Sequence, residues 1–151
     1  MKHSGMRWIT ILVVALPILS LISGCSGNTN SSNSLNMASM SDMPSEIQKA
    51  PVTVSEAYRF AVANPDALKN VPCYCGCAAV GHTSNYSCFV QEVKSSGEIV
   101  FDQHALGCSI CVDIAQDVMK MTRDGKAPQE IRTVIDQTYS QYGPSNMPPV
   151  Q

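Results

Sequence analysis

The sequence predicts a mainly α-helical domain, with three to four helices around a cysteine-rich loop. The first observation is that apolar residues recur at helical spacing in several stretches of residues 52–143, each bounded by Gly, Asn or Pro. The second is that six of the seven cysteines fall within residues 73–111, where helical periodicity is largely interrupted. With 151 residues and 44% hydrophobic residues, the chain has material for one small core.

The N-terminus has the pattern of a secretory signal. Lys2 and Arg7 precede an apolar run over residues 8–23, which Pro17 interrupts and which is shorter than the roughly 20 residues of a membrane-spanning helix. The run closes on Ile-Ser-Gly-Cys25, which resembles the lipobox of bacterial lipoproteins. The resemblance implies that residues 1–24 are removed and that Cys25 becomes a lipidated N-terminus, which anchors the protein to the extracytoplasmic face of the cell membrane.

Residues 25–51 are predicted to form a flexible tether, because Ser and Asn dominate and few side chains can be buried. Met37, Met40 and Met43 recur there at a spacing of three. Thioethers are soft ligands that suit Cu(I), and the triplet resembles the Met-rich motifs of extracytoplasmic copper-handling proteins. It is also consistent with chance or with a weak hydrophobic patch.

Four helices are expected after the tether. Thr53 to Glu56 has the pattern of a capping box and opens a helix that ends at Asn64, and Pro65 then begins a short second helix with Leu68 facing inward. The third spans about residues 109–124, and the last runs from near Pro128 to residue 143. Residues 98–101 are a brief apolar stretch, interpreted as one strand or an extended connection, and residues 144–151 form a Pro-rich tail. The faces expected to be buried are Val54, Ala57, Tyr58, Ala61 and Val62 in the first helix, Ile110, Cys111, Ile114, Ala115, Val118 and Met119 in the third, and Ile131, Val134, Ile135, Thr138, Tyr139 and Tyr142 in the last.

The cysteine-rich region predicts a soft-metal site. Three thiols alternate in Cys73-Tyr74-Cys75-Gly76-Cys77, where a disulfide between alternate neighbours would be strained but thiolates can converge on one ion. The expected ligands are the six thiols of this region, with two histidines as auxiliary ligands or supporting groups: Cys73, Cys75, Cys77, Cys88, Cys108, Cys111, His82 and His104. Cu(I) and Zn(II) both fit, and the softness of the thiols and the Met triplet favour copper.

Two other interpretations of the thiols remain open. Cys108 and Cys111 have the spacing of a redox dithiol at a helix N-terminus, although no thioredoxin-like βαβ pattern surrounds them. Alternatively, six thiols in an oxidising compartment can form three disulfides that staple an interaction domain.

Several function classes are disfavoured. The formal net charge is -2, so the chain has no basic surplus with which to bind nucleic acid. No Gly-rich phosphate loop or serine nucleophile elbow is present, and the carboxylates are scattered over apparently solvated faces. We therefore expect a metal-buffering or metal-delivery protein rather than an enzyme, with the membrane and a metal-donor or metal-acceptor protein as partners.

The string Pro-Cys-Tyr-Cys-Gly-Cys at residues 72–77 resembles the name-giving motif of the PCYCGC-motif lipoproteins. Gly81-His82, Cys88-Phe89-Val90 and the segment 104–111 look like later landmarks of that family, whereas Ala78-Ala79 departs from the further Gly that members often carry. The resemblance covers about residues 52–149 and implies an extracytoplasmic domain of largely uncharacterised function. A weaker likeness, in the Cys-Gly-Cys loop and the helix ending at residues 142–143, is to the helical thiol domain of cytochrome c maturation, which implies a three-helix fold and a redox role.

Overall fold

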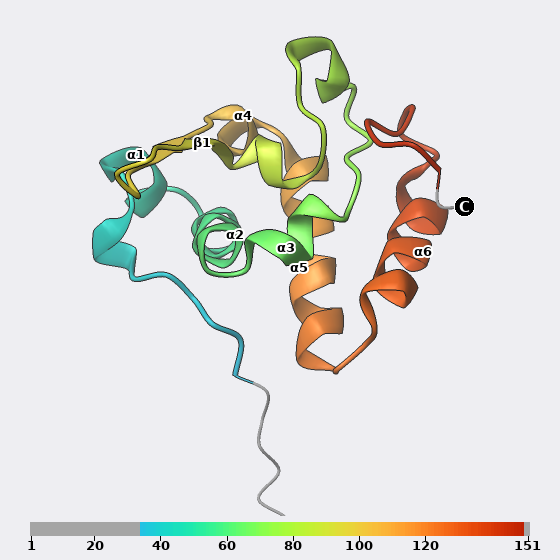
Figure 1. The fold of residues 1–151 in the computed structure, drawn as a ribbon, viewed down its shortest axis with the longest axis horizontal. Helices are drawn as coiled ribbons and strands as arrows, with labels where there is room; N and C mark the ends of the chain where they lie inside the picture. Colours follow the sequence, from blue (N-terminus) through green and yellow to red (C-terminus); the bar gives the residue numbers. More distant parts are fainter. Residues whose placement is uncertain (1–33, 150–151) are drawn as a thin grey trace, which may run out of the picture. The chain divides into compact units, whose positions relative to one another are not determined.

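The computed structural model describes residues 34–149, which belong to a single unit of the chain, Ser31–Gln151. The predicted signal segment, Cys25 and the first part of the predicted tether lie outside the described residues. Figure 1 shows a mainly helical arrangement, as the sequence predicts, together with one small two-stranded sheet. Between residues 34 and 149, none of the helices has both the length and the apolar character needed to cross a bilayer. The elements in chain order are η1 (Met40–Asp42), α1 (Ser45–Gln48), α2 (Val52–Ala63), α3 (Pro65–Lys69), η2 (Cys77–Val80), η3 (Tyr86–Cys88), β1 (Val90–Val93), β2 (Ile99–Phe101), α4 (His104–Gly107), α5 (Ser109–Arg123) and α6 (Pro128–Tyr139).

The core lies between α2, α5 and α6. Helix α5 packs against both α2 and α6, and Figure 1 shows α5 and α6 side by side, joined by a short connection. This connection contains Gly125. Gly125 has φ 75°, a conformation that glycine adopts without strain, so it ends α5 as predicted. Most of the residues expected on the inner faces are buried, including Tyr58, Ala61, Ile114, Val118 and Ile135. The cysteine-rich region contacts this core at the start of α5, where Cys111 is buried.

The predicted tether is wrong in its second half. Met43, which follows η1, is 3% exposed, and Ile47 in α1 is 2% exposed. Both belong to the hydrophobic core. The extended segment before them is also attached to α2, because the backbone of Ala38 exchanges hydrogen bonds with Arg59. A stretch rich in Ser and Asn therefore packs on the helices through its few apolar residues, and the folded domain begins well before residue 52.

The sheet is a β-hairpin of which the sequence predicts only the second strand. β1 pairs antiparallel with β2, with Val90 opposite Phe101 and Val93 opposite Ile99. The pattern of β1 is hard to recognise, because its first residue is buried and the next three are exposed. The hairpin places Asp102 and α4 beside the cysteine-rich loop.

The helices differ from the predictions at two of their ends and in part of their buried faces. The predicted capping box does not form, because α2 begins one residue before Thr53 with Pro51 as its cap. Helix α6 ends at Tyr139, so Tyr142 lies beyond it and is exposed rather than buried. Thr138 lies inside α6 but is also exposed. Four further residues expected to be buried are only partly buried: Val54, Val62, Ile110 and Val134.

Helix α6 also contributes a buried charged residue, Arg132, which its sequence pattern did not predict. Arg132 is 7% exposed, and its guanidinium donates to both carboxylate oxygens of Asp136 at 2.9 and 3.0 Å. The buried charge is therefore paired within one turn of α6, as buried charges generally are.

Candidate metal centre

Three segments bring the cysteines together. Cys73, Cys75 and Cys77 lie on the loop that follows α3, and Gly76 has φ 83°, which lets this loop turn. Cys88 ends η3, on the next segment of the chain. Cys108 caps α5 and Cys111 lies in its first turn, while His104 begins α4 just before them. The start of α5 thus lies directly beside the loop, with Cys111 Sγ 3.4 Å from Cys73 Sγ.

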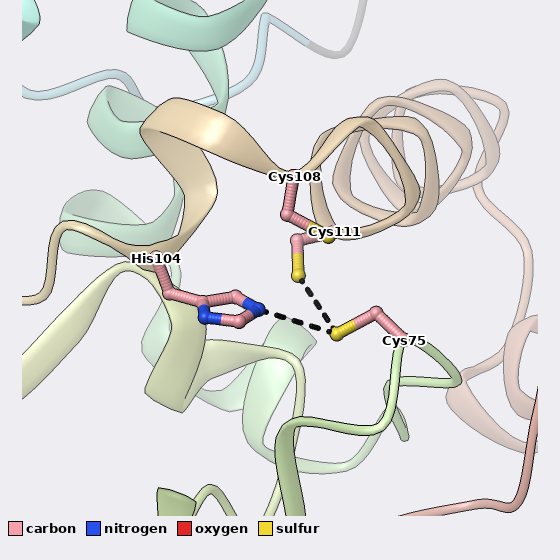
Figure 2. Close-up of side chains that lie close together, drawn as sticks. All are labelled: Cys75, His104, Cys108 and Cys111. Carbon is pink, nitrogen blue, oxygen red and sulfur yellow. Dashed lines mark hydrogen bonds between the residues drawn. The ribbon is translucent and has the colours of Figure 1, made fainter.

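The first group of ligand atoms comprises Cys75, His104, Cys108 and Cys111, called here the outer set. All four atoms lie within 4.8 Å of one another. Figure 2 shows the Cys75 thiol joined by dashed lines to the His104 ring and to the Cys111 thiol. Cys75 Sγ lies 3.4 Å from His104 Nε2 and 3.5 Å from Cys111 Sγ. Three sulfurs and one imidazole at such distances form a donor set typical of a tetrahedral metal ion.

The second group comprises Cys73, Cys77 and Cys88, called here the inner set. Their three sulfurs also lie within 4.8 Å of one another, and Cys77 Sγ is 3.8 Å from Cys88 Sγ. All three residues are deeply buried, with 0%, 3% and 0% of their surface exposed. The inner set is therefore an all-sulfur donor set that water scarcely reaches.

The two sets are in contact through Cys73. Its Sγ lies 3.4 Å from Cys75 Sγ and 3.4 Å from Cys111 Sγ, although both of these belong to the outer set. All six cysteines of the described region are free thiols, so these short distances are non-bonded contacts. The six sulfurs form one continuous cluster.

Electrostatics make this cluster a poor place for more than one unpaired negative charge. Hydrogen bonds from the Cys111 and Cys88 thiols lower the pKa of Cys73 to about 2, in spite of its burial. Burial and repulsion by Cys73 raise the pKa of Cys75 and of Cys77, and the hydrogen bond to Cys73 is the main cause that raises the pKa of Cys111. The neighbouring thiols thus favour a thiolate at Cys73, and a bound cation would favour deprotonation of the other thiols.

His82 lies beside the cluster, outside both sets. Its Nε2 is 3.3 Å from Asp102 Oδ2, and its ring meets the His104 ring edge to face at 5.2 Å. Asp102 also accepts the backbone N–H of His104 at 2.7 Å. One carboxylate therefore contacts the His82 ring and the backbone of His104, so it connects His82 to the start of α4. Of the eight predicted ligands, seven are gathered into the two sets and His82 has a supporting position.

The predicted methionine ligands have a packing role in the structure. Met43 is buried in the core, and Met37 and Met40 are partly buried against it. The hydrophobic interpretation of the triplet is therefore the one that the structure shows, and metal binding by these thioethers stays a prediction.

A family model described as "Protein of unknown function with PCYCGC motif" matches residues 14–150. The chain belongs to this family. No curated protein and no solved structure shows significant similarity to it. In this member of the PCYCGC family, the name-giving motif supplies one thiol to the outer set and two to the inner set.

Two asparagines of this PCYCGC domain support the loop and were not predicted. Asn146 accepts the backbone N–H of Cys73 at 2.7 Å, and its amide donates to the His82 carbonyl at 3.2 Å. Asn85 is fully buried and donates to the Cys111 carbonyl at 3.2 Å. Neither residue stands in a periodic pattern, and Asn146 lies in the Pro-rich tail, so the sequence contains no local signal for these contacts.

Proposed function

We propose that this protein binds a soft metal ion, with Cu(I) favoured over Zn(II), and buffers or delivers it at the membrane surface. The observation that supports the proposal is the convergence of six free thiols and one imidazole on two contiguous sets of ligand atoms. Three separate segments contribute thiols to this cluster. Packing of the core alone would not require cysteines from all three segments to meet at one place.

The donor chemistry favours a soft cation. The ligand atoms are sulfurs apart from one histidine nitrogen, and soft thiolate ligands select Cu(I), zinc and iron–sulfur clusters. The inner set offers three sulfurs, a number that Cu(I) accepts. The outer set matches the Cys3His composition of structural zinc sites, which keeps Zn(II) as the second candidate.

The proposed location follows from the N-terminal sequence. A lipobox-like Cys25 predicts anchoring by lipid on the extracytoplasmic face, with removal of residues 1–24. A tethered metal-binding domain of this kind would exchange its ion with a donor or acceptor protein at the same surface. We propose no catalytic activity.

A redox role is the second candidate, and one observation favours it. Cys108 is partly exposed at the start of α5, and its sulfur lies within 4.8 Å of Cys111 Sγ. Cys111, however, is fully buried and its pKa is raised, whereas reactive thiols usually have a lowered pKa and some exposure. A redox role predicts that Cys108 and Cys111 form and break a disulfide while the other four thiols remain unchanged.

The test is anaerobic purification of the full chain in detergent, followed by metal analysis and by mass-spectrometric mapping of free thiols in residues 73–111. Metal binding predicts six free thiols after metal removal and stoichiometric copper or zinc before it. A matched control replaces Cys75, Cys108 and Cys111 with Ala and should lower the metal content. Metal-free protein with three disulfides would contradict the proposal, and a reversible disulfide confined to Cys108 and Cys111 would favour the redox role.

A further inference from the structure

We infer that the cluster holds two Cu(I) ions, one in each set, that share the Cys73 thiolate, and that the outer ion is the one exchanged with partners. The inference rests on the proposed metal-binding function and deepens it. Four observations support it: the composition of the two sets, the position of Cys73, the difference in burial, and a surface cavity at Cys108.

The two sets differ in the number of donors. The inner set supplies three sulfurs, which suits a three-coordinate Cu(I) and leaves a tetrahedral ion one ligand short. The outer set supplies three sulfurs and His104 Nε2, so an ion there gains a fourth, neutral donor. The structure therefore offers two coordination environments instead of one site with surplus thiols.

Cys73 is placed to belong to both environments. It is a member of the inner set, yet its Sγ is 3.4 Å from two sulfurs of the outer set, those of Cys75 and Cys111. A thiolate sulfur has more than one lone pair, so it can bind two ions at once. Sharing it lowers the number of thiolates per ion, which reduces the negative charge that must be buried.

The difference in burial gives the two ions different access to solvent. The residues of the inner set are at most 3% exposed, whereas Cys75, His104 and Cys108 of the outer set are each partly exposed. A surface cavity of about 320 Å³ is lined by Cys108 together with residues of α2, α4 and α5, among them Val54 and Leu106. An incoming ligand in this cavity therefore meets the outer set at Cys108, whereas no residue of the inner set lines the cavity.

The experiment titrates the metal-free full chain, anaerobically in detergent, with Cu(I), and then follows its removal by an excess of a chromophoric Cu(I) chelator. The expected result is two equivalents bound and two phases of removal of equal amplitude. Replacing Cys75, Cys108 and Cys111 together with Ala removes every sulfur of the outer set, so this variant should bind one equivalent and lose the fast phase. Replacing Cys77 and Cys88 together with Ala leaves the inner set only Cys73, so this variant should bind one equivalent and lose the slow phase, with helical circular dichroism recorded for both variants.

The outcomes separate this inference from the proposed function. Failure to bind Cu(I) would overturn both. One equivalent in the unmodified protein, or more than two, would overturn the two-ion assignment while leaving metal binding intact. Two equivalents removed in a single phase, or loss of the slow phase in the variant that lacks Cys75, Cys108 and Cys111, would overturn the order of exchange. X-ray absorption of the doubly loaded protein should contain a Cu···Cu scattering path, and its absence would contradict the shared Cys73 thiolate.

Discussion

Asn146 shows how a single residue outside the motif fixes the geometry of the thiols. Its side chain accepts from the Cys73 backbone at 2.7 Å and donates to the His82 carbonyl, while its own N–H donates to the Cys73 carbonyl at 3.2 Å. The same amide approaches Cys77 Sγ at 3.6 Å. One asparagine therefore connects both ends of the motif to the residues that follow it.

Replacing Asn146 should destabilise the metal-free protein. Asn146→Ala leaves the buried Cys73 N–H without a partner, and we expect the free energy of unfolding to fall by about 1–3 kcal/mol. Chemical denaturation under reducing conditions measures the change. The matched control is Asn70→Ala, at an exposed position, which should change stability by less than about 1 kcal/mol. Equal effects of the two substitutions would contradict the role of Asn146.

Tyr74, the residue between the first two thiols, makes stability depend on alkaline pH. It is 4% exposed, and its hydroxyl donates to Asp136 Oδ1 at 2.6 Å. Burial and this hydrogen bond raise the pKa of Tyr74 to about 12 from its ordinary value of 10.0. The folded state therefore binds the proton more tightly than the unfolded state does, and the stability that results is complete below pH 10.0 and is lost as the pH rises toward about 12.

Tyr74→Phe should flatten this part of the pH profile. At pH 8 the variant should be less stable by about 1 kcal/mol because the hydrogen bond is lost. Between pH 10 and 12, which bracket the ordinary and raised pKa values, it should lose less stability than the unmodified protein. Denaturation curves across this range, with the exposed Tyr142→Phe as control, measure the difference. Parallel pH profiles for Tyr74→Phe and the unmodified protein would show that Tyr74 is not responsible.

At the scale of elements, the segment after α6 is a structural part of the domain rather than a free tail. Gly143 lies so close to the loop that a Cβ on it would be 2.7 Å from the Tyr74 carbonyl oxygen. Because the obstacle is a backbone atom, the two segments must separate to admit a methyl group. Glycine is required at this position by close approach.

Gly143→Ala should therefore reduce the free energy of unfolding by about 1–3 kcal/mol, the range for overpacked sites. Gly107→Ala is the matched control, since a Cβ there meets no atom within 4 Å. Thermal denaturation of both metal-free variants measures the contrast. A Gly143→Ala variant as stable as Gly107→Ala would mean that the tail does not pack on the loop.

Helix α6 contains two ion pairs of the same spacing but different environments. The Arg132–Asp136 pair is largely buried, and Arg132 also donates to the carbonyls of Asn70 and Pro148, so it joins α3, α6 and the tail. The Lys126–Glu130 pair is considerably more exposed. Their energetic contributions should differ accordingly, because solvent screens the exposed pair.

Arg132→Met should destabilise the protein by about 2 kcal/mol, because it removes three groups of hydrogen bonds and leaves a partly buried carboxylate without its cation. Lys126→Met, the control, should cost less than about 1 kcal/mol. Urea denaturation at neutral pH compares the two variants. Similar losses would indicate that Arg132 acts only as a surface charge.

The elements that periodicity could predict are those with one continuous apolar face. Helix α5 was predicted almost to its ends, because its inner residues recur at helical spacing and Gly125 stops it. Strand β1 and helix α1 were missed, since each is only four residues long and has one buried residue. Such short elements form because of the surfaces on which they pack, and those surfaces cannot be predicted from the local sequence.

The sequence could predict which residues form the candidate site, but not how they divide into the outer and inner sets. The spacing of the cysteines identified all six thiols and His104 as one neighbourhood. That Cys73 and Cys77 join Cys88, while Cys75 between them joins Cys108 and Cys111, follows from which way each side chain of the loop points. This direction depends on Gly76, on Asn146 and on the position of α5, and these are tertiary relations.

At the scale of the whole molecule, the small helical fold positions thiols from distant parts of the chain. The loop after α3 and the start of α5 are brought together by the packing of α2, α3 and α5. Hydrogen bonds from Tyr58 to the Asp102 carbonyl and from Asn85 to the Cys111 carbonyl connect this frame to the metal centre. The folded domain is therefore expected to present its ligands already close to a binding geometry.

The most direct test of the metal centre is X-ray absorption at the copper edge, recorded on the full chain loaded with Cu(I) under anaerobic conditions. The account predicts a first coordination shell dominated by sulfur, with a minor nitrogen contribution that disappears in His104→Ala. The sulfur contribution should persist in His82→Ala, because His82 lies outside both sets. A shell made of nitrogen and oxygen, without sulfur, would contradict the account.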